Sequence, residues 1–580
     1  MTTLSNPPDQ LKSRYEIVVV GSGYGGGIAA SRLARAGRQV CLLERGKEFA
    51  AGGFPNTMRH FIEETQWDLP ARHIGSDTGL YDLRLNDDIN VFLGCGLGGT
   101  SLINAGVSLR VESSVLDDER WPAAIRKELN TGRGEREFGL LEDYYRCAED
   151  MLKPAPYPES RPMPPKMAAL QTAAATLKLP FYRVPVNVNF EPLKDGLNHV
   201  GARQNPCIAC GDCGSGCNYD AKSTIVMNYL PDARNHGAEI YTRVSVRFVE
   251  RQGDEWVVHC RQMAADSAGG AEMVVRAGTV ILAAGTLGST EILLRSRERG
   301  LPVSDALGTR FSGNGDLVGW TYNSNRVVNG IGFGSKSPEG RLPVGVWASG
   351  IIDARKTHGF VIIEGAFPGA MARALPFLFA TGDIGGVHTQ PGFLNKVKEK
   401  LRILTSLFFP YTGATMNTQT YLVVNHDDSG GRMHLADDRL RVSWPNIGDA
   451  QVFKDSRERL RQATQALSGT FITTLKWQDK NEQVLLTGHP TGGCAMADQA
   501  ETGVVNDRGQ VFKGAAGAQL HEGLYVMDGA VIPRSIGVNP LLTISALAER
   551  SCRLLAADNG WTIDYSLPRA RSSRAAGEAP

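Results

Sequence analysis

The sequence predicts an α/β fold in more than one domain, and three observations lead to that prediction. The chain has 580 residues, which is too many for one small domain and enough to bury a large core. Residues 15–44 show the pattern of a strand, a helix and a second strand, because an apolar run ending at glycines precedes apolar residues at helical spacing and then a second apolar run. Further β-rich runs lie between glycines at 320–365 and at 418–445.

The composition excludes several classes of protein. Lys and Arg number 62 against 61 Asp and Glu, so the formal charge of +1 gives no sign of a basic surface, and we expect no nucleic-acid partner. Residues 1–14 are polar and lack the basic and then apolar pattern of a signal peptide, which predicts a cytoplasmic protein. No run reaches the roughly 18 consecutive apolar residues that a membrane-spanning helix needs.

The first expected strand leads into a glycine-rich loop of the G-x-G-x-x-G type. Gly21 permits a tight turn, Gly23 lets backbone N–H groups approach a pyrophosphate, and Gly26 lets the next helix pack on the sheet. Glu44 ends the second strand, where it can accept hydrogen bonds from ribose hydroxyls. These parts stand in the expected order, so they predict a dinucleotide site, although they leave the choice between FAD and NAD open.

The remaining segments predict further elements. Residues 86–110 are glycine-rich and predict an extended segment over a ligand, whereas 239–249 and 279–284 predict strands and 289–296 a helix. Residues 366–411 carry two apolar clusters around a basic stretch. They predict either a buried helical pair or a lid or membrane-surface element over a lipophilic site.

Four segments carry a family resemblance. They are FLGCGLGGTSLINAGV at 92–107, GTLGSTEILLRS at 285–296, GHPTGGCAM at 488–496 and LYVMDGAVIPRSIGVNPLLTISALAER at 524–550. In this order, and over almost the whole chain, they resemble the glucose-methanol-choline (GMC) flavoprotein oxidoreductases, in particular the branch of the bacterial cholesterol oxidases. One departure is Thr290, which stands where the family usually has Pro or Ser.

The resemblance implies an FAD site built from distant segments. It places the second glycine-rich segment along the isoalloxazine and ribityl chain, and the C-terminal segments at the phosphate or ribityl region and at the N1/O2 end of the flavin. Ile103 stands where some members carry a His bonded to the flavin, which implies non-covalent FAD. The expected cofactor-binding residues are Gly21, Gly23, Tyr24, Gly25, Gly26, Glu44, Gly94, Gly98, Gly99, Ser101, Asn104, Val244, Asp528, Gly529, Asn539 and Pro540.

The resemblance also implies the division into domains. A discontinuous, Rossmann-like FAD-binding domain is expected to comprise residues 13–115, 197–315 and 484–560. A substrate-binding domain with an antiparallel sheet and helices is expected to comprise residues 116–196 and 316–483. The tail, residues 569–580, is poor in apolar residues, which predicts disorder.

Two polar residues near the C-terminus are the expected catalytic pair. Hydride transfer from an alcohol to flavin N5 needs a base for the hydroxyl proton and a second polar group that fixes the oxygen. The resemblance implies that His489 is the base and Asn539 the second group. Each residue precedes a proline, so the alternative for each is a purely structural role in a turn.

One position differs from the cholesterol oxidases, which carry a glutamate that moves a proton in steroid isomerisation. Thr415 occupies that position in a rough alignment, and no carboxylate occurs between Tyr411 and Asn425. Glu364 is an alternative source of a carboxylate. A steroid oxidase with isomerase activity therefore stays an alternative to oxidation alone.

Four cysteines cluster in one short loop. Cys207, Cys210, Cys213 and Cys217 have the C-x2-C-x2-C-x3-C spacing of ferredoxin-type iron–sulfur ligands, but Asn218 replaces the usual proline after the fourth cysteine. Zinc and metal-free reduced thiols are the two alternatives. An iron–sulfur cluster would pass electrons from the flavin to a protein or quinone acceptor.

Three functions compete at this point. The leading one is FAD-dependent oxidation of a lipophilic alcohol, such as a sterol, a terpenoid or a long-chain alcohol, with peripheral membrane contact as an accompanying hypothesis. The second is a flavin-binding electron-transfer subunit without substrate turnover of its own. The third is an NAD(P)-dependent dehydrogenase, and the flavin-type segments after residue 90 count against it.

Overall fold

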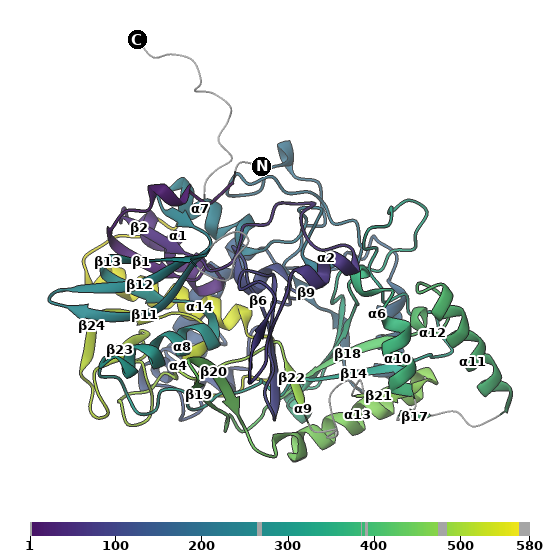
Figure 1. The fold of residues 1–580 in the computed structure, drawn as a ribbon. Helices are drawn as coiled ribbons and strands as arrows, with labels where there is room; N and C mark the ends of the chain where they lie inside the picture. Colours follow the sequence, from purple (N-terminus) through teal and green to yellow (C-terminus); the bar gives the residue numbers. More distant parts are fainter. Residues whose placement is uncertain (1–2, 264–269, 384–385, 389–392, 474–483, 568–580) are drawn as a thin grey trace, which may run out of the picture.

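The computed structural model describes residues 3–263, 270–383, 386–388, 393–473 and 484–567 (Figure 1). The tail for which the sequence predicts disorder, residues 569–580, lies outside this part of the chain. Among the described helices, none is both long enough and apolar enough to cross a membrane.

An eight-stranded sheet is built around the N-terminal strand. β1 pairs in parallel with β2 and β13, and β13 also pairs in parallel with β24, near the C-terminus. The apolar run of β1 is buried, with Ile17, Val18 and Val19 fully enclosed, which explains its continuous rather than alternating pattern. The strands are β1 (Arg14–Val20), β2 (Val40–Leu43), β10 (Glu239–Tyr241), β11 (Val244–Gln252), β12 (Glu255–Met263), β13 (Gly270–Leu282), β23 (Gln510–Phe512) and β24 (Leu520–Val526).

Helices pack on this sheet and join the two ends of the chain. The first helix, α1, contacts α7 and the C-terminal helix α14, and α14 also contacts α5. The C-terminal elements β24 and α14 therefore lie beside the N-terminal βαβ unit, as the resemblance implies. The helices are α1 (Tyr24–Arg35), α5 (Glu142–Leu152), α7 (Tyr229–Asn235), α8 (Gly285–Glu298) and α14 (Leu541–Asp558).

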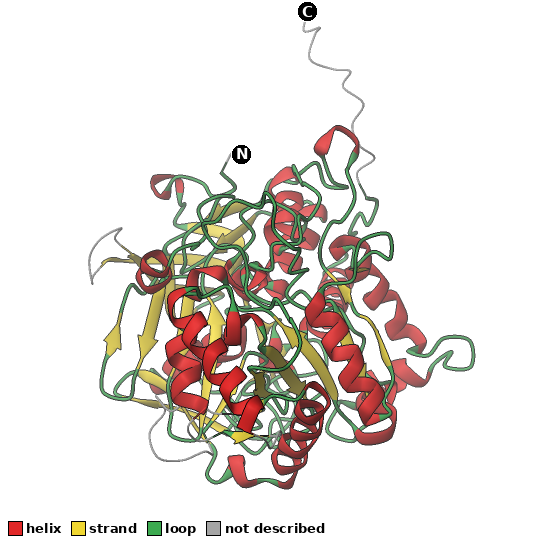
Figure 2. Cartoon of the chain, turned by 90° about the vertical axis from the view of Figure 1, so that its right-hand side faces the viewer, coloured by secondary structure: helices red, strands yellow, loops and turns green. Residues whose placement is uncertain are grey.

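A seven-stranded antiparallel sheet occupies the other end of the molecule. Its strand order is β17-β21-β14-β18-β16-β15-β8, and α6 and α13 pack against it; Figure 2 shows helices outside the strands at this end. These elements are β8 (Phe181–Arg183), β14 (Leu317–Tyr322), β15 (Gly350–Asp353), β16 (Val361–Gly365), β17 (Val387–His388), β18 (Gln419–Val424), β21 (Thr470–Ile472), α6 (Pro165–Leu177) and α13 (Gln451–Leu467). The architecture confirms the expected α/β fold with a separate antiparallel sheet, whereas the domain boundaries stay predictions.

A smaller sheet lies between these two and carries part of the site. β22 pairs in parallel with β6, so the residue after β22 is held beside the second glycine-rich segment. That segment was expected to be extended throughout, but after β6 it forms a 3-10 turn over Gly99–Leu102. The strands are β3 (Thr65–Asp68), β4 (His73–Ile74), β5 (Tyr81–Arg84), β6 (Ile89–Gly94) and β22 (Leu485–Thr487), with a nearby hairpin of β19 (Arg432–Ala436) and β20 (Arg439–Ser443).

The segment 366–411 forms two helices at the outer edge of the molecule. Leu375 and Phe379 of α10 are buried in a cluster with Trp320, whereas Phe377 is exposed. The expectation of a buried helical pair therefore holds for α10 only on the face that carries Leu375 and Phe379. The remaining elements are α2 (Met58–Glu63), α3 (Ser113–Leu116), α4 (Ala123–Asn130), α9 (Arg355–His358), α10 (Leu375–Asp383), α11 (Phe393–Phe408), α12 (Gly413–Met416), β7 (Ala155–Pro156) and β9 (Pro185–Val186).

A buried ion pair links α1 to α14. The Arg32 guanidinium donates to both carboxylate oxygens of Glu549 at 2.7–3.0 Å, and the two side chains are 3% and 0% exposed. The Tyr229 hydroxyl donates to the same carboxylate at 2.7 Å. A buried ion pair of this kind adds little net stability over an apolar pair, but loss of one partner leaves the other charge uncompensated.

We expect Glu549→Gln to lower the free energy of unfolding by about 3–5 kcal/mol, because Arg32 then keeps its buried charge without a counter-charge. Urea unfolding followed by circular dichroism measures the change. The matched control is Glu16→Gln, which breaks the partly exposed pair with Arg38 and should cost about 1 kcal/mol or less. Equal effects of the two substitutions would contradict this account of the helix contact.

Candidate active site

One cavity of about 870 Å³ runs along the carboxyl ends of β1 and β2 and under the second glycine-rich segment. Its wall gathers residues from segments that are far apart in the chain. The sequence-predicted residues in this wall are Gly21, Gly23, Tyr24, Gly25, Glu44, Gly94, Gly99, Asn104, Val244, His489, Asp528, Gly529, Asn539 and Pro540.

Three expected cofactor residues lie behind the wall rather than in it. A Cβ atom on Gly26 would lie 1.9 Å from the Gly21 carbonyl oxygen, so this glycine serves helix packing. The Ser101 hydroxyl donates to the Gly98 carbonyl oxygen at 2.6 Å and accepts from the Ile225 N–H at 3.1 Å. Gly98 and Ser101 therefore shape the segment from behind.

The glycine loop leaves open space where a phosphate would approach. Gly21 has a positive φ of 94°, which favours glycine, and its Cβ would overlap the Ala283 carbonyl. At Gly23 the direction of a Cβ is free of atoms within 4 Å. The loop thus combines a forced turn at Gly21 with free space at Gly23, at the N-terminus of α1, where backbone N–H groups favour anions.

Glu44 faces the cavity but is already engaged by its own loop. Its carboxylate accepts from the Ser22 N–H at 3.1 Å, from the Ser22 hydroxyl at 2.6 Å and from the Gly46 N–H at 2.7 Å. A carboxylate has about four lone-pair positions, so one remains for a ribose hydroxyl. Ser22 was not singled out from the sequence, because it occupies a variable position of the glycine motif.

Asp528 ties the C-terminal segment to the start of α8. It accepts from the Gly285 N–H at 2.9 Å, from the Ser289 hydroxyl at 2.5 Å and from the Ala530 N–H at 2.8 Å. Burial raises the pKa of Asp528 to about 6, although these three donors oppose the shift. Its main contacts are therefore within the protein, and they hold Gly529 at the cavity wall.

His489 lies between two polar partners. Its Nδ1 is 2.8 Å from Oδ1 of Asp316, and its Nε2 is 3.0 Å from Nδ2 of Asn539. The second oxygen of Asp316 accepts from the Gly488 N–H at 3.0 Å and from the Thr487 hydroxyl at 3.0 Å. These contacts fix both the rotamer of the imidazole and the orientation of the carboxylate.

The partners of His489 also select its tautomer. A carboxylate can only accept, so Nδ1 carries the hydrogen and donates to Asp316, which leaves the lone pair on Nε2. The amide of Asn539 donates to this lone pair, and its Oδ1 is buried with no hydrogen-bond partner among the described residues. The site therefore presents an unprotonated imidazole nitrogen and an unsatisfied acceptor next to each other at the cavity wall.

The sequence analysis missed Asp316. This residue lies at the start of the strand region that begins with β14, and 173 residues separate it from His489. Its sequence context, FSGNGD, resembles no segment with an assigned chemistry. Only the local abundance of glycine and polar residues marks it, and that feature fits an ordinary loop equally well.

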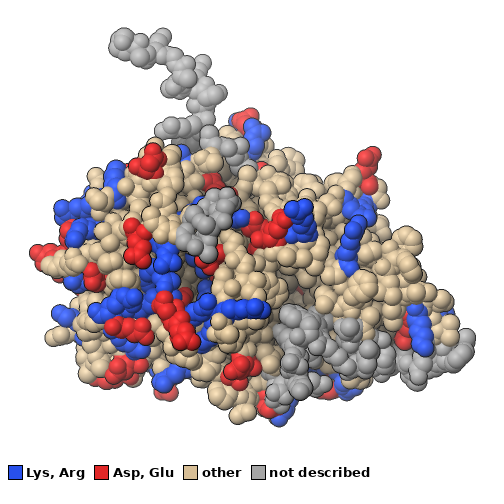
Figure 3. All heavy atoms as spheres, in the orientation of Figure 1, with Lys and Arg blue, Asp and Glu red and all other residues tan. Residues whose placement is uncertain are grey.

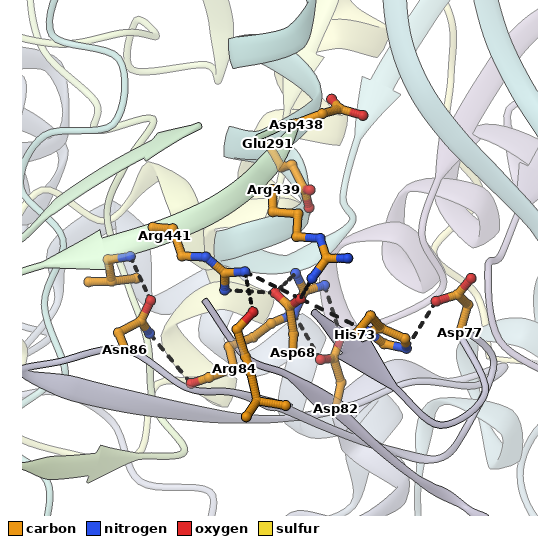
Figure 4. A network of polar contacts seen from close by, with 12 residues as sticks. Asp68, His73, Asp77, Asp82, Arg84, Asn86, Glu291, Asp438, Arg439 and Arg441 are labelled. Atoms are coloured by element: carbon orange, nitrogen blue, oxygen red, sulfur yellow. Dashed lines mark hydrogen bonds and ion pairs between the residues drawn. The ribbon is translucent and has the colours of Figure 1, made fainter. Parts of the chain in front are cut away.

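A network of charged side chains forms the polar end of the cavity (Figure 4). Asp68 accepts from Arg84 at 3.2 Å and from Arg441 at 3.0 Å, which links β3, β5 and β20. Asp82 accepts from Arg84 and Arg45; burial opposes its ionisation, but these two guanidinium groups hold its pKa well below the usual range. The network keeps this wall rigid and polar.

The cysteine loop does not form the expected metal site. The four cysteines border a void of only about 20 Å³ together with Lys222, and no group of three or more His, Cys, Asp or Glu among the described residues is arranged to hold a metal ion. Burial raises the pKa of Cys207 to about 12, so this thiol is protonated. The spacing of Cys207, Cys210, Cys213 and Cys217 was therefore misleading as a sign of convergent ligands, and the structure gives the iron–sulfur interpretation no support.

Two further expectations do not hold at the cavity. Glu364 is fully buried and accepts from Lys166 at 2.9 Å and from the Ser349 N–H at 2.7 Å, so it is no free carboxylate for isomerisation. Neither Glu364 nor Thr415 lines the cavity, and no described residue of 366–411 does so. Of the alternatives for that segment, a lid over the site therefore has no support among the described residues.

Comparison with known proteins places this arrangement in a family. Two models described as GMC oxidoreductase match the chain, the N-terminal one over residues 24–311 and the C-terminal one over residues 434–548. The chain belongs to the GMC oxidoreductases. Together the two models span well over half of its length, and they include helix α1, which follows Gly23 of the glycine loop, and the segment that carries His489.

Relatives of this GMC oxidoreductase include two groups of oxidases. A cholesterol oxidase of Acinetobacter baumannii is 26% identical, and the match covers 94% of each chain. A long-chain-alcohol oxidase of Arabidopsis thaliana is 25% identical over 92% of this chain and 66% of the relative. Pyridoxine 4-oxidase from Mesorbium loti has the same fold, with a TM-score of 0.57 at 16% identity over 94% of this chain and 99% of the other.

GMC oxidoreductases are FAD-dependent, and the cavity fits that cofactor. Gly23 and Gly285 both border it with open space where a side chain would begin, so backbone groups can meet a phosphate closely. At the other end, the Asn539 Oδ1 is a buried acceptor that a bound ligand can satisfy. The residues around the cavity therefore suit a long ligand with a charged middle and a polar ring system.

We expect Gly23→Ala to weaken FAD binding roughly tenfold or more, because the added methyl group enters the space in which the pyrophosphate is expected. The ratio of flavin to protein absorbance after dialysis measures the loss. Gly134→Ala is the matched control, since a methyl group added at Gly134 also meets no atom within 4 Å but lies away from the cavity. Full FAD retention by Gly23→Ala would contradict the assigned position of the phosphates.

Proposed function

We propose that this GMC oxidoreductase oxidises a lipophilic alcohol to the carbonyl compound, with non-covalent FAD as the hydride acceptor and His489 as the base. The observation that carries the proposal is the tautomer of His489. Asp316 holds the hydrogen on Nδ1, so Nε2 keeps its lone pair, which accepts from the Asn539 amide at the cavity wall. A substrate hydroxyl can take the place of the amide at Nε2, because His489 and Asn539 both line the cavity.

The chain's own residues supply the acid–base and positioning parts of the reaction. The substrate hydroxyl displaces the Asn539 amide from Nε2 of His489 and donates to this nitrogen, which takes the proton as the carbonyl forms. The Asn539 amide N–H that is released from the imidazole then donates to the substrate oxygen and fixes it. Asp316 is a positioning residue, since it orients the ring and stabilises the imidazolium that results. When bound, FAD supplies the acceptor for the hydride.

The class of alcohol is inferred from the relatives. The cholesterol oxidases and long-chain-alcohol oxidases act on hydroxyl groups attached to large hydrocarbon bodies, and their similarity covers more than nine tenths of this chain. We therefore favour a sterol or a long-chain alcohol over a sugar. Oxidation without isomerisation is the simpler reaction here, because neither Thr415 nor Glu364 offers a carboxylate to the cavity.

The alternative of an electron-transfer subunit without turnover fits the site less well. Such a subunit needs the flavin cavity but not the ordered trio of Asp316, His489 and Asn539. It would also benefit from a second redox group, and the cysteine loop does not form a group of metal ligands. We therefore propose that electrons leave from the flavin directly to the external acceptor.

A double-mutant cycle tests the proposed roles. His489→Gln should leave FAD bound but slow flavin reduction by roughly 10²–10⁴-fold, the usual contribution of a positioned base. Asp316→Asn should also act through Nε2 of His489. The oxygen of the new amide must face the Gly488 N–H in order to accept from it, so the NH₂ group faces Nδ1 of His489. Because Nδ1 must then accept, the imidazole hydrogen moves to Nε2. Anaerobic stopped-flow reduction measures both variants.

The double variant should then be little slower than His489→Gln alone, because both changes remove the same lone pair. Asp427→Asn is the matched control, since this buried carboxylate bonds to Ser312 and the Gly315 N–H on the same loop but not to His489. Additive effects, or equal losses in Asp316→Asn and Asp427→Asn, would show that Asp316 acts only through the stability of the loop.

A further inference from the structure

Helix α11 presents an apolar face to solvent. Val397, Leu401, Leu404 and Phe408 recur at intervals of four, three and four residues, which places them along one side of the helix, and Phe409 follows them. Leu401 is 59% exposed, Phe408 73% and Phe409 65%. We call these five residues the α11 face. Single exposed apolar residues are common on proteins, but a continuous stripe of this kind marks an interaction surface.

The opposite side of α11 is anchored to the protein. Ile403 packs against the cluster that contains Trp320, and the Arg402 guanidinium donates to the side chain of Asn323 at 2.6 Å and to its carbonyl oxygen at 3.0 Å. The Ser406 hydroxyl donates to the Thr412 carbonyl oxygen at 3.0 Å. The orientation of the helix is thus fixed, and the outward direction of the α11 face is a feature of the fold.

The α11 face lies at one extremity of the molecule. Figure 1 places α11 at the edge farthest from β2 and β13, and Figure 3 shows that this end carries few charged side chains compared with the opposite end. No residue of the α11 face borders the cavity of the candidate active site. An exposed apolar stripe at an extremity of the molecule and away from the active site is accessible to an extended apolar medium.

Cations flank the α11 face. Lys398 and Lys400 are exposed on the same helix, with only Glu399 between them. Lys336 and Arg341 from a neighbouring loop lie over the Tyr411 ring at 4.8 Å and 5.1 Å from its centroid, close to the Phe408 end of the helix. Lysine and arginine around an apolar stripe complement the anionic headgroups that cover a lipid surface.

We propose that the α11 face docks the protein on the surface of an anionic lipid bilayer. The apolar side chains enter the boundary between headgroups and acyl chains, while Lys398, Lys400 and their neighbours pair with phosphate groups. Such peripheral binding needs both signals, since an apolar stripe or a few cations alone give weak attachment. Because the α11 face is separate from the candidate active site, docking does not depend on the proposed reaction.

Vesicle flotation of the FAD-loaded protein tests the proposal. We expect the protein to float with vesicles of phosphatidylcholine and phosphatidylglycerol, less with phosphatidylcholine alone, and less at high salt. Replacing Leu401 and Phe408 together by Ser should lower the partition coefficient roughly 10–100-fold, since two large apolar side chains no longer leave water. Lys398→Glu combined with Lys400→Glu should remove the preference for anionic vesicles.

The matched control is Ile62→Ser combined with Leu140→Ser, which alters two other exposed apolar residues and should leave flotation unchanged. Anaerobic flavin reduction of each variant reports separately on the active site. The proposal is wrong if the natural protein stays with the soluble fraction, or if the Leu401 and Phe408 variant floats as the natural protein does. It is also wrong if that variant instead dissociates a dimer, because the α11 face would then join two copies of the chain.

Discussion

The contact between the first helix and the C-terminal segment is the constraint on which the candidate site depends. A Cβ atom on Gly25 would lie 1.5 Å from the Met527 carbonyl oxygen, so only glycine lets the two backbones meet. That contact sets Asp528 and Gly529 at the cavity and fixes the approach to α14. Farther along the same helices, the buried pair of Arg32 and Glu549 holds them in place. The cavity exists because the two ends of the chain close on each other.

The parts of the site that follow from local spacing were predictable from the sequence. The strand, glycine loop and helix at residues 15–35 are recognisable because each glycine has a distinct backbone task within a few residues. The family resemblance of the segments around them pointed to His489 and Asn539, and both residues line the cavity. Asp316 was not, since its partner lies 173 residues away and its own segment has no pattern of known chemistry. The contact between Asp316 and His489 depends on how the sheet that contains β14 and the sheet that contains β22 are placed relative to each other, and short segments do not encode that placement.

Two of the alternatives that the sequence left open found no support, and the reason is the same for both. The spacing of Cys207, Cys210, Cys213 and Cys217 gives the order of the thiols along the chain, but the direction of each side chain depends on the surrounding fold. In the same way, the apolar residues of 366–411 indicate that the segment meets a non-aqueous surface without saying which one. The structure places them away from the cavity, and part of the segment forms the α11 face. Composition and spacing thus predict the kind of contact better than its location.

The most direct test of the central claim is anaerobic reduction of the bound flavin by a long-chain primary alcohol and by the same alcohol deuterated at the carbinol carbon. The account predicts that the flavin bleaches with both and that the deuterated alcohol reacts more slowly, because the bond to the transferred hydrogen breaks as His489 takes the hydroxyl proton. A sterol should also bleach it, whereas glucose and choline should not. Rapid bleaching by glucose or choline, with none by the long-chain alcohol or the sterol, would contradict the account.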